Sequence, residues 1–392
     1  MSGRHFLFVP GPTNVPDRVL RAMHRAQEDH RSSAFPALPR AIFTDLKKVF
    51  GTTAGQAFIF PATGSAMWEA SLVNSLSPGD RVLACRNGHF SHLFIDCAQR
   101  LGLRVDVIEA EWGDGVPADK IGSALAADSA HEIKAVLVVH NETATGVTSD
   151  LAEVRHSMDA ARHPALLHVD GVSSVGSLDF RFDEWKVDFA IAGSQKGFMM
   201  PAGLGLVCVS QKGLAMADQA KCPRAFFDIR EQAKHNADGY FPYTPALAHL
   251  FGLRESLTML MEEGLEQVNA RHRRLGEGVR RAIAAWELKL CARDPKLLSN
   301  TVSAVVVPEG SDSRRVIDIA FRRYNLSLGA GLGRLGGKVF RIGHVGDLNE
   351  LMLLGALAGV EMALNDAGIA VVLGSGVAAA QHWYRESAPS LG

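Results

Sequence analysis

Short apolar runs alternate with segments of helical periodicity from residue 57 to about residue 204, and this alternation is the strongest constraint on the fold. The runs, which we predict to be strands, cover residues 57–60, 81–85, 104–109, 133–140, 165–170 and 187–191, with another beginning at residue 204. They are apolar along nearly their whole length, so both faces of each strand are expected to be buried. Such strands, separated by helices, predict a mostly parallel sheet in an α/β/α sandwich.

The pattern changes after about residue 245, where helices and strands no longer alternate regularly. The elements predicted there are a long helix at 247–281, strands at 301–307 and 338–342, and helices at 313–325 and 348–363. This order predicts a smaller C-terminal α+β domain. We expect a large domain of residues 15–250 and a small domain of residues 251–392, with residues 1–14 contributing to the active site.

The charge is balanced, with 41 Lys and Arg against 42 Asp and Glu residues and a formal net charge of −1. A balanced chain gives no electrostatic reason to expect a nucleic acid or an anionic membrane as partner. No apolar run approaches the ~18–20 residues of a membrane span, and the first residues lack the apolar core of a signal peptide. The five cysteines are odd in number and lack metal-ligand spacing. We therefore predict a cytoplasmic protein without a metal site.

The predicted strand at 187–191 runs into small and polar residues that carry a single lysine, Lys196. Burial at the end of a strand disfavours the charged form of an amine and lowers its pKa. A lysine with a lowered pKa can act as a nucleophile towards an aldehyde near neutral pH. The commoner alternative is a lysine that extends from the strand end into solvent.

A carboxylate, Asp170, ends the predicted strand at 165–170. The carboxyl ends of parallel strands meet at one edge of a sheet, where ligands of such sheets bind. A lysine and an aspartate at that edge meet the needs of pyridoxal 5′-phosphate, because the lysine forms a Schiff base and the aspartate keeps the pyridine nitrogen protonated. This pairing favours the catalytic interpretation of Lys196.

Two polar turns that follow other predicted strands suit the rest of such a cofactor. Thr63, Gly64 and Ser65 open a helix, where hydroxyls and backbone N–H groups near the positive end of the helix dipole suit a phosphate ester. An ordinary helix cap is the alternative. Thr143, in the polar turn at 140–146, is a candidate partner for the phenolic oxygen of the cofactor, and an ordinary polar loop is the alternative.

An arginine, Arg341, lies inside the apolar strand predicted at 338–342. A buried guanidinium needs a partner, and a substrate carboxylate would supply charge-assisted bonds of roughly 1.5–3 kcal/mol each. An internal pair with Asp or Glu is the alternative. Residues 331–336 fit the dinucleotide pattern G-x-G-x-x-G but precede a strand and not a helix, so we interpret them as a glycine-rich turn.

The sequence around Lys196 (193–196), together with residues 170–174, resembles that of the class V aminotransferases, which are pyridoxal-phosphate enzymes of fold type I. The resemblance covers essentially the whole chain. Within the family it is greatest with the bacterial serine–glyoxylate aminotransferases, through residues 7–14, 141–147, 239–245 and 340–348. It implies a fold-type-I architecture and a homodimer whose active sites are shared between subunits.

The resemblance also implies a role for each candidate residue. Those implied for the cofactor are Lys196 (Schiff base), Asp170 (pyridine nitrogen), Thr143 (phenolic oxygen), Val172 and Phe90 (the two ring faces), and Thr63, Gly64, Ser65 and Gln195 (phosphate). Those implied to reach the phosphate of the neighbouring subunit are Thr244 with Tyr240 or Phe241. Arg341, through the substrate carboxylate, and Asn14 would bind the substrate.

The implied reaction is ping-pong transamination of L-serine with glyoxylate, giving 3-hydroxypyruvate and glycine. L-Alanine or L-aspartate as donor is the nearest alternative, because donor selectivity rests on a few pocket residues. A lyase of the cysteine desulfurase type fits less well, since Gln195 and not His precedes Lys196, and the only later cysteines are Cys222 and Cys291. A cofactor-free binding protein would leave the combination of Lys196, Asp170 and Arg341 without a reason.

Overall fold

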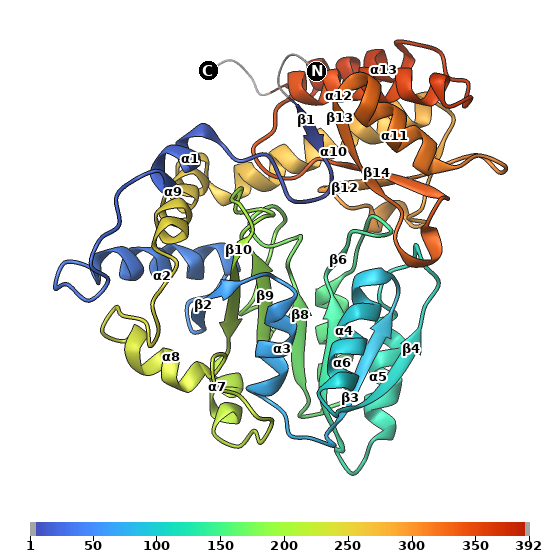
Figure 1. The fold of residues 1–392 in the computed structure, drawn as a ribbon. Helices are drawn as coiled ribbons and strands as arrows, with labels where there is room; N and C mark the ends of the chain where they lie inside the picture. Colours follow the sequence, from blue (N-terminus) through green and yellow to red (C-terminus); the bar gives the residue numbers. More distant parts are fainter. Residues whose placement is uncertain (1–4, 389–392) are drawn as a thin grey trace.

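The computed structural model describes residues 5–388, which form sheets of seven and five strands and a separate two-stranded pair. The seven-stranded sheet occupies the lower part of the molecule in Figure 1. In spatial order its strands are β2 (Gln56–Ala62), β10 (Gly203–Val209), β9 (Phe189–Gly193), β8 (Leu166–Asp170), β5 (Ile133–Val139), β3 (Arg81–Arg86) and β4 (Arg104–Glu109).

This sheet is mostly parallel, as predicted from the apolar runs. Neighbouring strands from β9 to β4 are parallel, and only β10 runs antiparallel to both of its neighbours. In the register of β8 and β9, Asp170 lies opposite Ile191. The carboxyl end of β8 and the residues that follow β9 therefore meet at the same edge of the sheet.

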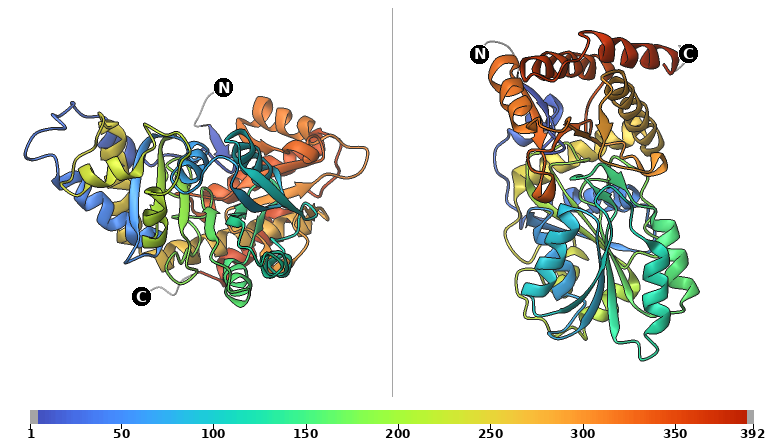
Figure 2. Two further views of the ribbon diagram at one scale, coloured as in Figure 1. Left: turned by 90° about the horizontal axis from the view of Figure 1, so that it is seen from below. Right: turned by 90° about the vertical axis from the view of Figure 1, so that its right-hand side faces the viewer.

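Helices cover both faces of the sheet, as the side view in Figure 2 shows. Their inward side chains form two separate apolar clusters. One cluster is contributed by α2 (Ala37–Phe50), α5 (Ala118–Ala127), α6 (Leu151–Ala160) and α9 (Leu247–Glu263), with α1 (Asp17–Met23) against α9. The other is contributed by α3 (Ala66–Val73), α4 (His89–Arg100), α7 (Gln211–Ala217) and α8 (Ile229–Asn236). The α/β/α sandwich is confirmed.

The five-stranded sheet lies above the large sheet in Figure 1. Its strands in order are β1 (Phe6–Phe8), β13 (Leu326–Ala330), β14 (Val339–Gly343), β12 (Val302–Val306) and β11 (Lys289–Leu290). The helices packed with it are α10 (Leu265–Ala285), α11 (Ser313–Tyr324), α12 (Glu350–Asp366) and α13 (Ser375–Glu386). The two-stranded pair is β6 (Asn141–Glu142) with β7 (Val147–Thr148).

The N-terminal segment joins the two sheets. Phe6 pairs with Leu326 in a parallel arrangement, so β1 belongs to the smaller sheet. A few residues later the backbone N–H of Thr13 donates to the carbonyl of Gln195 at 3.1 Å. The residues between β1 and Thr13 are thereby held beside the loop that carries Lys196.

The structure differs from the predicted elements in the second half of the chain. The helix predicted at 247–281 is two helices, because Gly264, with φ of 86°, ends α9 and begins α10. The sequence pattern also misses β13, which follows α11 after the single residue Asn325 in a left-handed conformation (φ 55°). It misses α13 as well, whose first turn contains Gly376.

Side chains of α9 pack on the large sheet, whereas α10 packs on the small sheet from Leu275 onwards. The division between residues 250 and 251 stays a prediction. Among residues 5–388, the structure has no helix that is long and apolar enough to cross a membrane.

Candidate active site

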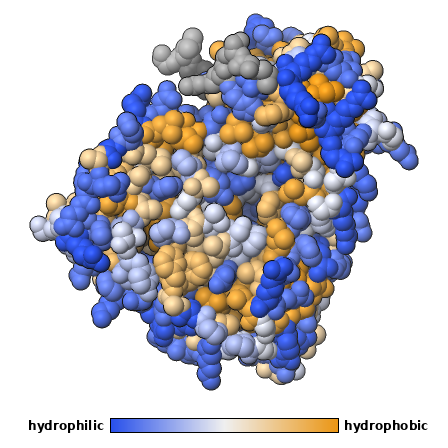
Figure 3. Space-filling view, viewed as in Figure 1, coloured by the Kyte–Doolittle hydropathy of each residue, from blue (hydrophilic) through white to orange (hydrophobic). Residues whose placement is uncertain are grey.

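A cavity of about 310 Å³ lies at the carboxyl ends of β5, β8 and β9. The face of the molecule in Figure 3 is hollowed between its upper and lower parts, above these strand ends. The predicted residues that line the cavity are Ser65, Phe90, Thr143, Asp170, Val172, Gln195 and Lys196. The other lining residues are Gly11, Pro12, Trp68, Val139, Asn141, Ser173 and Ala202.

Lys196 is partly buried and its amine faces the N-terminal segment. The Nζ atom donates to the carbonyl oxygen of Pro10. Gly11 has φ of 118°, and a Cβ atom there would lie 2.3 Å from Nζ, so a side chain at this position would occupy the place of the amine. Burial lowers the pKa of Lys196 to about 8, with Arg341 acting in the same direction and Asp170 opposing it.

Asp170 is only 5% exposed, and two donors fix its carboxylate. The backbone N–H of Val172 donates to Oδ1 at 2.8 Å, and the indole Nε1 of Trp68 donates to Oδ2 at 2.9 Å. Burial raises the pKa of Asp170, whereas these two donors and Lys196 favour the carboxylate. The arrangement presents a fixed acceptor to the cavity.

The beginning of α3 lies beside the loop that carries Lys196. Ser65 is the N-cap residue, and its side chain does not cap the helix. Gly64 packs on Val172, because a Cβ atom at Gly64 would lie 2.7 Å from Cγ2 of that valine. Within the described chain, the side-chain oxygen of Gln195 is buried without a hydrogen-bond partner. The free backbone N–H groups at the start of a helix suit an anion, whereas the unpartnered oxygen of Gln195 is an acceptor and offers an anion no donor.

Phe90 and Thr143 are held at the cavity by a buried carboxylate, Glu142. The Oε2 atom of Glu142 accepts from the backbone N–H of Ser91 at 2.9 Å, and Oε1 accepts from that of Ala144 at 3.1 Å. These bonds fix the start of α4, which carries Phe90, to the turn that contains Thr143. Burial raises the pKa of Glu142, against the effect of its N–H donors.

Arg341 lies on β14 and is 8% exposed. Its Nε donates to the carbonyl of Ala330 at 2.8 Å, and Nη1 donates to that of Thr143 at 3.1 Å. Between residues 5 and 388, no carboxylate lies within 4.0 Å of this guanidinium, so the predicted alternative of an internal ion pair is not found there. Burial lowers the pKa of Arg341 to about 10, and the charge of Glu142 acts in the opposite direction.

The remaining predicted residues do not line the cavity. Asn14 donates through Nδ2 to the carbonyl of Leu7 at 2.9 Å. Tyr240 donates to the carbonyl of Ser32 at 3.2 Å. Thr63 and Thr244 are exposed. Exposure is compatible with the predicted contact of Thr244 with a neighbouring subunit.

Sequence reasoning missed several cavity residues. Trp68 follows Ser65 by three positions and therefore lies on the same side of α3. This spacing could have identified Trp68 as a cavity residue. Asn141 comes two residues after the end of β5, and its Nδ2 donates to Oγ of Ser173 at 2.8 Å and to Oγ1 of Thr301 at 2.9 Å. The position of Asn141 after a central strand was its signal, whereas nothing local points to Thr301.

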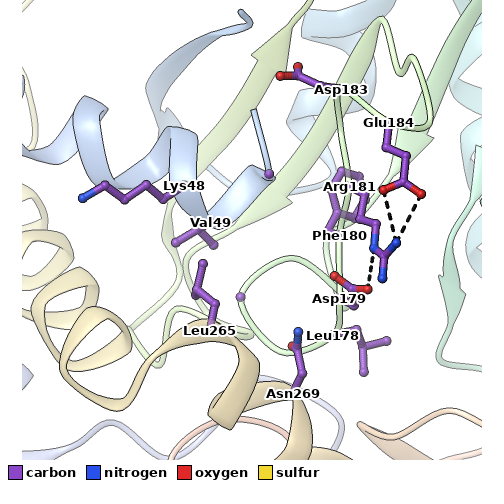
Figure 4. A pocket seen from close by; sticks show the side chains of 12 residues that line it. Lys48, Val49, Leu178, Asp179, Phe180, Arg181, Asp183, Glu184, Leu265 and Asn269 are labelled. Atoms are coloured by element: carbon purple, nitrogen blue, oxygen red, sulfur yellow. Dashed lines mark hydrogen bonds and ion pairs between the residues drawn. The ribbon is translucent and has the colours of Figure 1, made fainter. Parts of the chain in front are cut away.

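A second hollow, of about 350 Å³, lies between the end of α2, the loop at 176–184 and the start of α10. Figure 4 shows Arg181 in this hollow paired with the carboxylates of Asp179 and Glu184, at 2.7 and 3.1 Å. The charges here satisfy one another, and none of the predicted catalytic residues reaches the hollow. The cavity that contains Lys196 is therefore the candidate active site.

Residues at this cavity fit pyridoxal phosphate. The start of α3, which has no side-chain cap, offers backbone N–H groups, Asp170 offers a fixed carboxylate, and Gly11 leaves room for the amine of Lys196. Together these supply partners for a phosphate, a ring nitrogen and an aldehyde.

Comparison with known proteins gives matches over nearly the whole chain. The family model described as aminotransferase class-V matches residues 5–331. A serine–glyoxylate aminotransferase of Methylorubrum extorquens is 61% identical, over 98% of this chain and 97% of the relative. The serine–glyoxylate aminotransferase of Hyphomicrobium methylovorum is 54% identical, over 97% of this chain and 95% of the relative. An L-aspartate–glyoxylate aminotransferase of Paracoccus denitrificans is 51% identical, over 99% and 98%.

Solved structures give the same picture. A pyridoxamine–pyruvate aminotransferase of Mesorhizobium loti superposes with a TM-score of 0.91 at 27% identity, over 99% of this chain and 98% of that one. A ureidoglycine–glyoxylate aminotransferase of Bacillus subtilis superposes with a TM-score of 0.90 at 27% identity, over 98% and 99%.

Proposed function

The chain belongs to the class V aminotransferase family, whose members depend on pyridoxal phosphate, and we propose that it transfers the amino group of L-serine to glyoxylate. The products are 3-hydroxypyruvate and glycine. The observation that carries the proposal is the cavity in which a lysine of lowered pKa and a fixed aspartate lie together. Identities of 61% and 54% to serine–glyoxylate aminotransferases support the choice of substrates.

In this proposal the residues around the cavity hold the cofactor. Asp170 binds the pyridine nitrogen, Thr143 the phenolic oxygen, and Val172 and Phe90 the two faces of the ring. The residues proposed for the phosphate are Thr63, Gly64, Ser65 and Gln195, with Tyr240 and Thr244 of a second copy. When bound, pyridoxal phosphate supplies a carbonyl that accepts the amino group and a ring that accepts electrons.

Lys196 has two tasks in the proposed mechanism. It attaches the cofactor, and once displaced by the donor its amine takes the proton from the α carbon of the substrate as general base. A pKa of about 8 suits this task, because an appreciable fraction of the amine is then uncharged at neutral pH. Arg341 and Asn14 are proposed to bind the substrate, with the guanidinium on the carboxylate.

The donor panel is the experiment that tests the proposal. The amino donors L-serine, L-alanine and L-aspartate are compared at fixed glyoxylate, with 3-hydroxypyruvate, pyruvate and oxaloacetate as the measured products. We expect the highest kcat/KM with L-serine and parallel double-reciprocal lines, as ping-pong kinetics require. A higher kcat/KM with L-aspartate would show that L-aspartate, and not L-serine, is the preferred donor. L-Aspartate is the main alternative because the relative from Paracoccus denitrificans is an L-aspartate–glyoxylate aminotransferase.

A cysteine-based lyase has little support at this site. Burial raises the pKa of Cys222, and it raises that of Cys291 to about 11, so neither thiol is an effective nucleophile near neutral pH. Sulfide release from L-cysteine at a rate comparable to transamination would contradict this conclusion.

A homodimer with shared active sites is part of the same proposal. Exposed Thr244 lies next to Tyr243, whose ring stacks on that of Phe226 with centroids 5.4 Å apart, and both rings are 40% exposed. Figure 3 shows apolar side chains gathered in the lower middle of this face. Such a patch beside the site supports burial against a second copy. Sedimentation velocity should give twice the chain mass; a monomer with full activity would overturn the proposal.

A reducing cytoplasm is the compartment we propose. All five cysteines are free thiols. A secreted protein of this kind would be expected to contain disulfides. Fractionation of cells that express the protein is the direct test.

A further inference from the structure

We infer that Trp68 is a positioning residue for the cofactor. Its indole N–H fixes the carboxylate of Asp170 in the orientation that accepts a hydrogen bond from the protonated ring nitrogen of pyridoxal phosphate. The inference rests on the proposed role of Asp170. The bond between the two side chains joins α3 to the end of β8, elements that are far apart in the sequence.

The contacts leave the carboxylate of Asp170 little freedom. Oδ1 accepts from the N–H of Val172 at 2.8 Å, and Oδ2 accepts from Trp68 at 2.9 Å. One donor on each oxygen fixes the rotation of the carboxylate plane. The backbone donor is set by the turn after β8, whereas Trp68 supplies a side-chain donor to this carboxylate.

Trp68 is itself held rigidly. It is 5% exposed, and its ring stacks on that of Phe94 with an angle of 17° and centroids 5.7 Å apart. The stacking comes from α4, so two helices fix the indole. A rigid donor loses little conformational entropy when it makes its bond, which makes the bond more effective.

The position of Trp68 along α3 links it to the proposed phosphate site. Ser65 is the N-cap residue of the helix, makes no side-chain cap, and lines the cavity. Residues three positions apart lie on one side of a helix. A single short helix therefore carries the proposed phosphate contact at its first residue and the support of Asp170 one turn later, which sets the spacing between the two ends of the cofactor site.

The bond from Trp68 matters because it stabilises the negative charge of Asp170. Asp170 is buried, and burial alone favours its protonated form. A protonated carboxyl group would pair poorly with a protonated ring nitrogen. The N–H of Trp68 can only donate, so it favours the carboxylate over the neutral acid, because hydrogen bonds to charged groups are stronger than those to neutral groups.

The test is cofactor affinity, which does not depend on turnover. Trp68→Phe keeps a ring that can stack on Phe94 and removes the N–H. We expect the dissociation constant of the apoprotein for pyridoxal 5′-phosphate, titrated by absorbance, to rise about 10-fold or more. As the pH is lowered, the affinity should begin to fall at a higher pH than in the wild type. The reason is that loss of the Trp68 donor raises the pKa of Asp170, so its carboxylate is protonated earlier.

The chain offers a matched control. Trp286 donates through Nε1 to buried Glu361 at 3.0 Å in the small domain, so Trp286→Phe removes the same kind of bond elsewhere. We expect it to lower stability without changing cofactor affinity. Trp68→His retains a ring N–H on a smaller side chain and should bind the cofactor more tightly than Trp68→Phe; affinity no higher than that of Trp68→Phe would count against the N–H.

A double-mutant cycle with Asp170→Asn separates the proposed role of Asp170 in binding the cofactor from the inferred role of Trp68 in positioning Asp170. If Trp68 acts through Asp170, Trp68→Phe has little further effect on cofactor affinity once the carboxylate is gone. An equal loss in both backgrounds, or an unchanged affinity in the single variant, would overturn the inference. If Asp170→Asn alone leaves affinity unchanged, the proposed role of Asp170 fails first.

Discussion

Lys196 and Arg341 are both cations near the cavity, and burial has different consequences for them. It lowers the pKa of Lys196 to about 8 and that of Arg341 to about 10. Near pH 7.5 roughly a quarter of the lysine is then uncharged, whereas nearly all of the arginine stays charged. The same desolvation thus leaves one residue partly uncharged near neutral pH and the other a fixed positive charge.

Replacing the lysine tests its role directly. Lys196→Ala should have no measurable transamination, because both the attachment of the cofactor and the base are lost. The far-ultraviolet circular dichroism should stay that of the wild type, since the side chain lines a cavity. Lys120→Ala, at an exposed position of α5, is the control and should be fully active. Turnover retained in Lys196→Ala would refute the assignment.

Arg341→Ala should weaken binding of both substrates, because each carries a carboxylate. The expected loss in kcat/KM corresponds to roughly 2–5 kcal/mol if the pair is desolvated. Arg341→Lys keeps a charge without the planar fork and should recover only part of the loss. Steady-state kinetics with each substrate varied in turn check this; unchanged Michaelis constants for both would remove Arg341 from the site.

At the scale of elements, a buried carboxylate organises the junction of α12 and α13. Glu361, on α12, accepts from Nε1 of Trp286 at 3.0 Å and from the backbone N–H groups of Gly374 and Gly376, both at 2.7 Å. The first turn of α13 lacks a side-chain cap of its own. Glu361 therefore performs that function from a different helix.

Loss of this carboxylate should destabilise the small domain. Glu361→Ala leaves the start of α13 and the indole of Trp286 without their acceptor, which should lower the free energy of unfolding by roughly 2–4 kcal/mol. Glu386→Ala, at an exposed position of α13, should change it by less than about 0.5 kcal/mol. Denaturant unfolding measures both. Equal, small effects would mean that the cap is unimportant.

At the scale of the whole molecule, buried histidines lie in or next to the elements of both sheet layers. His140, His168, His272 and His344 are each 4% exposed or less. Burial lowers the pKa of His140 to about 4 and that of the other three to about 3. Their ordinary pKa, near 6.5, returns when the chain unfolds.

Stability should therefore depend on pH on the acid side. Between pH 6.5 and about 4 the unfolded chain binds more protons than the folded one, so stability is highest above pH 6.5 and is lost as the pH falls. Each histidine contributes up to ~1.4 kcal/mol per pH unit. His168→Phe, which can retain the stacking on Phe189, should reduce this slope, whereas exposed His92→Gln should not. Unfolding free energies at pH 5 to 8 provide the check; equal slopes in the wild type and His168→Phe would contradict it.

Much of the sheet, and the position of Asp170 and Lys196 at one cavity, was predictable from the sequence. Apolar runs identify buried strands because burial of both faces leaves no polar positions. β8 ends at Asp170 as predicted, whereas β9 ends at Gly193, two residues beyond the predicted run. Asp170 and Lys196 follow from those ends, since parallel strands finish at one edge of the sheet. Two boundaries escaped prediction because a single residue marks each of them. Gly264 alone separates α9 from α10, and Asn325 alone separates α11 from β13.

The sequence by itself determined which residues carry charge at the ends of the central strands, a property set by neighbours along the chain. Only the tertiary structure decided what surrounds them: the carbonyl of Pro10 at the lysine amine, Trp68 on Asp170, and the carbonyl of Thr143 on Arg341. These contacts join residues up to 198 positions apart. The physical reason is that a side chain's pKa and orientation depend on packing between elements, which no local pattern encodes.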